Sequence, residues 1–125
     1  MLPQYWRDFV EANRIVRKSF HLTESDDVSG IGADLIILTA ENSLDEGARY
    51  WPGIGVAADG YVPVAWCDLG SGDWFYINSN DGINGPLYRI YHDSVSEQGY
   101  DPSDAIAVVL QNYEKLLSRG ANDLT

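Results

Sequence analysis

The side chains that could carry out catalysis are few and poorly grouped. His92 and Asp93 are neighbours at the end of an expected strand, so they point to opposite sides, and Asp93 cannot easily orient the His92 imidazole as a triad requires. His21 lies in or before a polar loop, and Cys67 lies in an apolar run typical of a buried thiol. These residues at these spacings do not indicate a zinc site. We predict no catalytic residues, no metal and no cofactor; a hydrolase using carboxylates near His92 is the alternative.

Two short motifs resemble ligand-binding loops but lack the flanking elements that such loops need. Gly53 to Ala58 matches a loose dinucleotide fingerprint, yet Trp51-Pro52 precedes it where a strand should end, and Asp59-Gly60 follows where a helix should run. The stretch 78–82 resembles a calcium loop, but its glycine falls one place early and its closing acid is missing. We therefore expect a short strand over 54–57 and a surface turn over 78–82.

Charge is unevenly distributed along the chain. The formal net charge is −11, and residues 1–18 hold four basic side chains against two acidic ones, so the remaining residues carry the whole excess of acid. An acidic surface repels nucleic-acid phosphates and attracts basic proteins. The sequence therefore favours a basic protein partner and disfavours nucleic acid.

The sequence also predicts a cytoplasmic protein of one domain. A chain of 125 residues without internal repeats is expected to form a single core, here over 1–120 with a tail at 121–125. No apolar run is long enough to span a membrane, and charged residues interrupt the N-terminal stretch where a signal peptide would be apolar.

The stretch from Tyr61 to Ile77 organises the expected fold. It consists of two apolar runs joined by the turn Leu69–Gly72, in which Gly70 and Gly72 supply turn geometry. Both residue parities are apolar in both runs, which is typical of strands covered on two faces. We predict an antiparallel hairpin at the middle of the sheet, with Trp66 or Trp74 buried.

The flanking segments complete an α+β fold with a single, mainly antiparallel β-sheet of about four to six strands, flanked by N-terminal and C-terminal helices. Helical spacing of apolar residues predicts the N-terminal helix over 3–20. Asp101 and Pro102 form a start signal for the C-terminal helix, which an apolar stripe extends to about residue 117. The remaining expected elements are a loop over 21–32, strands over 34–39 and 86–92, and a short helix opened by Ser43 and closed before Pro52.

The strands are rich in aromatic side chains, which would be available to a partner wherever a helix covers only one sheet face. Acidic residues near the strand ends add charge where a basic partner could reach it. The predicted partner-binding residues are Trp66, Asp68, Asp73, Trp74, Tyr88, Tyr91 and Asp93.

The central stretch VPVAWCDLGSGDWFYIN resembles the core of the SUKH superfamily, the Smi/Knr-type domain. The resemblance rests on an apolar strand, the turn-closing pair Gly72-Asp73 and the aromatic run Trp74-Phe75-Tyr76. It extends from Leu2 to about Leu117 and implies an α+β domain that acts by binding protein. Many bacterial members resemble immunity proteins that neutralise a toxin, often a nuclease. Other members are regulatory scaffolds such as cell-wall synthesis regulators, and that alternative stays open.

Overall fold

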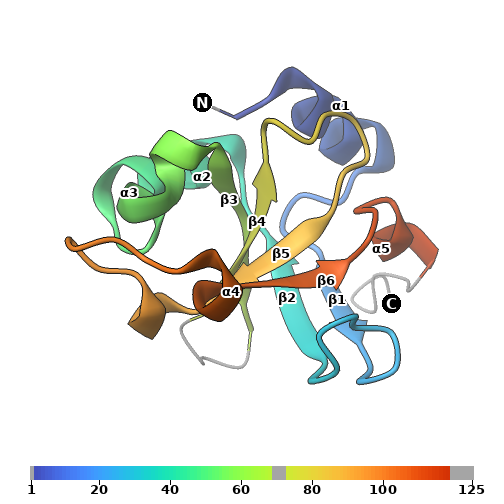
Figure 1. The fold of residues 1–125 in the computed structure, drawn as a ribbon. Coiled ribbons are helices and arrows are strands. Elements are labelled where there is room, and N and C mark those ends of the chain that lie inside the picture. Colours follow the sequence, from blue (N-terminus) through green and yellow to red (C-terminus); the bar gives the residue numbers. More distant parts are fainter. Residues whose placement is uncertain (1, 69–72, 119–125) are drawn as a thin grey trace.

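The fold is built on one curled antiparallel sheet whose strand order follows the chain order (Figure 1). The computed structural model describes residues 2–68 and 73–118; the predicted turn with Gly70 and Gly72, and the predicted tail at 121–125, lie outside these ranges. The strands are β1 Ser19–Leu22, β2 Ala33–Ile37, β3 Tyr61–Cys67, β4 Trp74–Asn78, β5 Leu87–Ile90 and β6 Ile106–Leu110.

The predicted central hairpin is confirmed. Strands β3 and β4 pair antiparallel in the middle of the sheet, with Val62 opposite Ile77 and Ala65 opposite Phe75. The register shifts between Pro63 and Ala65, which is the signature of a β-bulge. Apolar, β-branched and aromatic residues occupy both faces of this pair, because each face packs against its own core.

The two faces of the sheet carry separate cores. The first core is covered by α1 (Gln4–Asn13) and α5 (Lys115–Ser118), where Trp6 meets Tyr113 edge to face with ring centroids 5.1 Å apart. The second core gathers Val56 of α3 (Gly53–Val56) with Tyr76, Ile90 and residues from the segment 95–105. In Figure 1, α3 lies to the left of the sheet, and α1 and α5 lie to its right.

The N-terminal helix is shorter than predicted. α1 ends at Asn13, whose side-chain amide donates to the carbonyl of Phe9 over 2.8 Å, and Arg14 then adopts the left-handed conformation with φ 54°. The chain turns back so that Phe20, expected in the helix, and His21, expected in the loop, both lie in β1. No glycine or proline marks this helix end.

The predicted C-terminal helix is wrong over most of its length. Asp101 does act as N-cap, accepting the backbone N–H of Ser103, but α4 (Pro102–Ala105) ends after one turn. The chain continues as β6, which is rich in the β-branched residues Ile106, Val108 and Val109 and pairs antiparallel with β5. The apolar stripe that suggested a helix is divided between the two cores, because Ile106 packs against the second core and Val109, Leu110 and Leu116 lie in the first.

Two smaller expectations in the segment 40–60 are also corrected. α2 (Ala40–Arg49) begins three residues before Ser43, because Thr39 is its N-cap and accepts the backbone N–H of Asn42 over 3.1 Å. The expected strand over 54–57 is the helix α3, continued by the 3-10 turn η1 (Ala57–Asp59). A β-carbon on Gly53 would lie 2.6 Å from the carbonyl oxygen of Glu46, so this glycine lets α3 pack directly on α2.

Candidate protein-binding surface

Trp66 and Trp74 form an aromatic pair across the ends of the central hairpin. Their ring centroids are 6.5 Å apart with an interplanar angle of 50°. Both side chains are partly exposed, so the expectation that one of them is buried is wrong. Phe75, on the opposite face, takes the buried position instead and is 1% exposed. The two tryptophans therefore border solvent and can contact a partner.

The sheet face that holds these tryptophans is left partly uncovered near β1 and β2. Ile36 lies opposite Trp66, and Asp34 lies opposite His21, so alternate residues of three strands share this face. Buried residues alternate with partly exposed or exposed ones along β1 and β2. The outward residues include a hydrogen-bonded pair, the Nδ1 atom of His21 and the Oδ1 atom of Asp34, 2.7 Å apart.

Asp73, His92 and Asp93 form a linked cluster beside Trp74. The Oδ1 atom of Asp73 lies 2.7 Å from Nδ1 of His92 and accepts the His92 backbone N–H over 3.0 Å. The Nε2 atom of His92 lies 3.1 Å from a carboxylate oxygen of Asp93. The expectation that His92 and Asp93 point to opposite sides is thus wrong, because the 3-10 turn η2 (His92–Ser94) brings the Asp93 carboxylate to the imidazole ring.

The contacts of His92 suit a structural role. Both of its ring nitrogens face carboxylates, so neither is directed at a hydroxyl or thiol within 2–68 or 73–118. The cluster joins the start of β4 to the end of β5 and fixes the position of two predicted acidic residues. Sequence reasoning named those acids, but it missed the imidazole that holds them together.

Asp68 and Tyr91 lie at the same end of the sheet. Asp68 is exposed just beyond β3, and its backbone N–H donates to the carbonyl of Asp34 over 2.8 Å. Tyr91 is partly buried just beyond β5, where its backbone N–H donates to the carbonyl of Ala105 over 2.8 Å. Six of the seven predicted residues thus come from neighbouring strand ends: Trp66, Asp68, Asp73, Trp74, Tyr91 and Asp93.

Tyr88 belongs to a second aromatic cluster further along the same face. Its ring meets Tyr61 edge to face at 5.3 Å, and its hydroxyl donates to Asp81 over 2.7 Å. Burial, followed by the bond to Asp81, raises the pKa of Tyr88. Tyr100 similarly donates to Asp59, and burial with that bond raises the pKa of Tyr100. These tyrosines remain hydrogen-bond donors well above neutral pH.

Acidic side chains dominate the segments that build this face. Arg89 is the one Lys or Arg residue between positions 50 and 110, and none of the acidic side chains there is buried. The acidic residues are Asp59, Asp68, Asp73, Asp81, Asp93, Glu97, Asp101 and Asp104.

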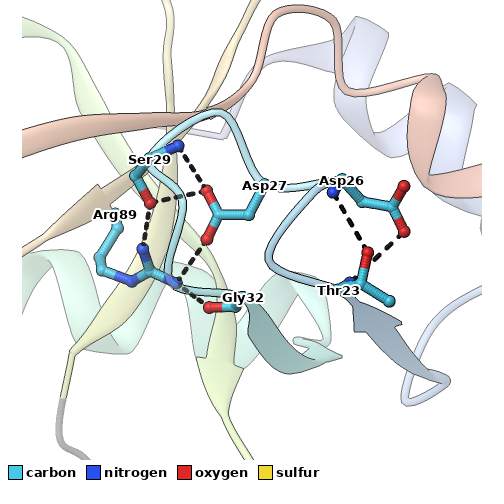
Figure 2. Close-up of polar contacts among 6 residues, drawn as sticks. All are labelled: Thr23, Asp26, Asp27, Ser29, Gly32 and Arg89. Atoms are coloured by element: carbon cyan, nitrogen blue, oxygen red, sulfur yellow. Dashed lines mark hydrogen bonds and ion pairs between the residues drawn. The ribbon is translucent and has the colours of Figure 1, made fainter.

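The one arginine of this region is buried, and Figure 2 shows the polar contacts that its side chain makes. Arg89 is 4% exposed, and its guanidinium donates to Ser29 Oγ over 2.8 Å and to the Gly32 carbonyl over 2.7 Å. It also pairs with the buried carboxylate of Asp27 at 3.3 Å and lies 5.2 Å from the centre of the Phe75 ring. This charge is neutralised internally, so it does not offset the surface acids.

The described residues contain no group of three or more His, Cys, Asp or Glu side chains that could hold a metal ion. Among the same residues, none of the helices has the length and apolar character needed to cross a membrane. Cys67 is partly buried and packs against the first core.

The fold and surface define an α+β protein with a six-stranded antiparallel sheet and an acidic, aromatic face. Comparison of the chain with protein-family models, curated proteins and solved structures finds no match.

Proposed function

We propose that this protein is a non-enzymatic binding domain that recognises a basic protein, and that it acts as an immunity protein against a toxin. The observation that carries the proposal is the partly exposed Trp66–Trp74 pair bordered by Asp68, Asp73 and Asp93. Tryptophan is enriched among the residues that dominate binding energy at interfaces. The resemblance to the SUKH superfamily supports the toxin-neutralising role, which would be exercised in the cytoplasm.

Charge and aromatic contact have separable effects in such a complex. The acidic face would steer a basic partner and raise the association rate constant toward about 10⁸ M⁻¹s⁻¹ at low salt, against roughly 10⁵ to 10⁶ for uncharged pairs. The tryptophans, once desolvated, would set the lifetime of the complex, because buried anchors act mainly on dissociation.

The test is affinity capture of the partner followed by binding kinetics across a series of salt concentrations. We expect Asp68→Asn with Asp93→Asn to slow association and flatten its salt dependence, and Trp66→Ala to speed dissociation. Asp8→Asn with Glu11→Gln is the matched control, because it likewise removes two negative charges, but from α1, on the other side of the sheet. Association that does not depend on salt would contradict steering and favour the regulatory scaffold.

A growth assay tests the toxin-neutralising role itself. Cells that express the captured partner should be rescued by the wild-type protein and less well by the Trp66→Ala variant. A partner that is harmless to cells would refute the immunity role, even if binding were tight.

A further inference from the structure

A second surface lies on the side of the sheet covered by α1. It is apolar with basic side chains at its border, in contrast to the acidic, aromatic face described above. A groove of about 440 Å³ runs between α1 and the segments around Val16 and Leu38, a volume within the range of small-molecule sites. Its apolar lining consists of Leu2, Trp6, Val10, Val16, Leu38 and Ala40.

The shape of the groove follows from the way α1 ends. The left-handed turn at Arg14 sends the chain back beside the helix, and the Ile15 backbone N–H donates to the Val10 carbonyl over 3.1 Å. Val16 therefore lines the groove although it is 43% exposed, whereas Trp6 and Leu38 are buried and form its floor.

Three charged residues border this apolar floor. Arg7, Glu11 and Arg14 line the groove and are exposed. Arg7 and Glu11 lie four residues apart on one side of α1, and Arg14 follows at the left-handed turn that ends the helix. Neither guanidinium makes an ion pair or hydrogen bond with any residue in the described ranges. In a chain of net charge −11, this groove thus presents two unpaired cations beside apolar surface.

We propose that the groove binds a monocarboxylate with an unbranched apolar body, a medium-chain fatty acid, whose carboxylate is held by Arg7 and Arg14. Guanidinium groups bind carboxylates through strong, charge-assisted hydrogen bonds, and the apolar floor accepts the hydrocarbon. Glu11 lies between the two arginines in sequence and disfavours a second negative charge on the ligand.

The chemistry of the lining favours this ligand over a peptide segment. A peptide would bring backbone N–H and C=O groups that need partners once they are buried. Among the lining side chains of the described residues, Glu11 is the only acceptor, and the backbone N–H groups of Arg14 and Leu38 already donate to the carbonyls of Glu11 and Val64. A hydrocarbon chain makes no such demand.

The test uses decanoate as the probe, at concentrations below micelle formation, with decanol as the uncharged control, and follows binding to the full chain by calorimetry. We expect saturable 1:1 binding of decanoate and at least about tenfold weaker binding of decanol, since hydrogen bonds to charged groups carry that difference. Arg7→Gln combined with Arg14→Gln should reduce decanoate affinity to the level of decanol.

Two further variants test the assignment from opposite directions. Glu11→Gln should strengthen decanoate binding about two- to fivefold by removing a like charge. Arg17→Gln is the matched control, because Arg17 is exposed, has a left-handed backbone with φ 64° and does not line the groove. All these residues are exposed, and circular dichroism confirms that each variant is folded.

Each remaining outcome overturns the proposal. Absence of saturable decanoate binding removes the site. Equal affinity for decanol means that the arginines do not recognise the carboxylate. An Arg17→Gln variant as weak as the double variant means that binding reflects general attraction to basic residues.

Discussion

Replacing Arg89 by Met should destabilise the fold strongly, because it leaves a buried carboxylate without its cation. The side chains of Arg89 and Asp27 are 5% and 0% exposed, so water cannot solvate the remaining charge. The substitution also removes the donors to Ser29 and to the Gly32 carbonyl. Breaking a buried pair from one side costs about 3–5 kcal/mol. Since small domains are stable by about 5–15 kcal/mol, the loss is a large fraction of the total.

A second variant separates the effect of charge from that of packing. Asp27→Asn removes the carboxylate charge but keeps the Oδ1 atom that accepts the Ser29 backbone N–H over 2.7 Å and the Ser29 hydroxyl over 2.6 Å. The double variant Arg89→Met with Asp27→Asn therefore contains no buried charge at this position. We expect it to be more stable than Arg89→Met alone by about 1–2 kcal/mol, although it carries one more substitution.

Urea unfolding followed by tryptophan fluorescence measures all three variants. Arg49→Met is the control, because Arg49 pairs with Asp45 at 3.0 Å but is 73% exposed, and such pairs contribute less than about 1 kcal/mol. The reasoning fails if Arg89→Met costs no more than this control. It also fails if the two substitutions at positions 27 and 89 destabilise additively, because the unpaired charge would then not be the cause.

Three further predictions concern the sheet and its helices. Trp66→Ala should cost about 1–2 kcal/mol, and Phe75→Ala about 3–5 kcal/mol, because only Phe75 is fully buried; equal costs in urea unfolding would contradict this assignment of faces. Burial raises the pKa of Glu46, so the folded state binds this proton more tightly than the unfolded state, and the free energy of unfolding falls as pH rises through the carboxyl range. Glu46→Gln should therefore stabilise the fold at pH 7 and have no effect on its stability at pH 3. Tyr88→Phe should cost about 1 kcal/mol at pH 8, because it removes the hydrogen bond to Asp81. The pKa of Tyr88 is raised in the folded state, so above about pH 10 the tyrosine ionises first in the unfolded state, and the stability difference between the two proteins should disappear. A difference in the free energy of unfolding that stays constant with pH would refute the link.

The sequence predicts the centre of the fold better than its ends. The β3–β4 hairpin is readable because apolar residues of both parities flank a turn signal, a pattern that is local in the chain. β6 is not predictable from the sequence, because its apolar positions suit a helix as well as a strand. The segment is a strand because it pairs with β5, and that pairing is not visible in the local sequence. Gly53 and Gly55 contributed to the wrong prediction of a strand over 54–57 for a similar reason. A β-carbon on Gly55 would lie 2.6 Å from both Trp51 and Val95, so tertiary packing, which the sequence does not show, requires glycine there.

The arrangement of the predicted surface residues could likewise be predicted where it depended on residues near each other in the chain, and not where it depended on strand pairing. Acids next to strand ends are visible in the sequence, and the structure gathers Asp68, Asp73 and Asp93 at one end of the sheet. The bridging role of His92 depends on the alignment of β4 with β5, which places Trp74 opposite Ile90 and so brings residue 73 beside residue 92. Tyr88 lies with Tyr61 for the same reason, because strand register, and not sequence distance, determines its neighbours.

The loop that carries Asp27 also has a consequence for the rate at which the protein unfolds. Every pair of adjacent strands is consecutive in the chain, so the sheet can assemble by successive pairing of strands that are neighbours in sequence, which keeps the entropy cost of each closure low. The contacts of this loop with Arg89, together with the Val28 N–H donated to the Val109 carbonyl over 2.8 Å, instead join the early part of the chain to the last two strands. We expect these contacts to form after the sheet that they join, so weakening them should accelerate unfolding while leaving the folding rate almost unchanged. On this expectation, the contacts of the loop slow the unfolding of the folded state.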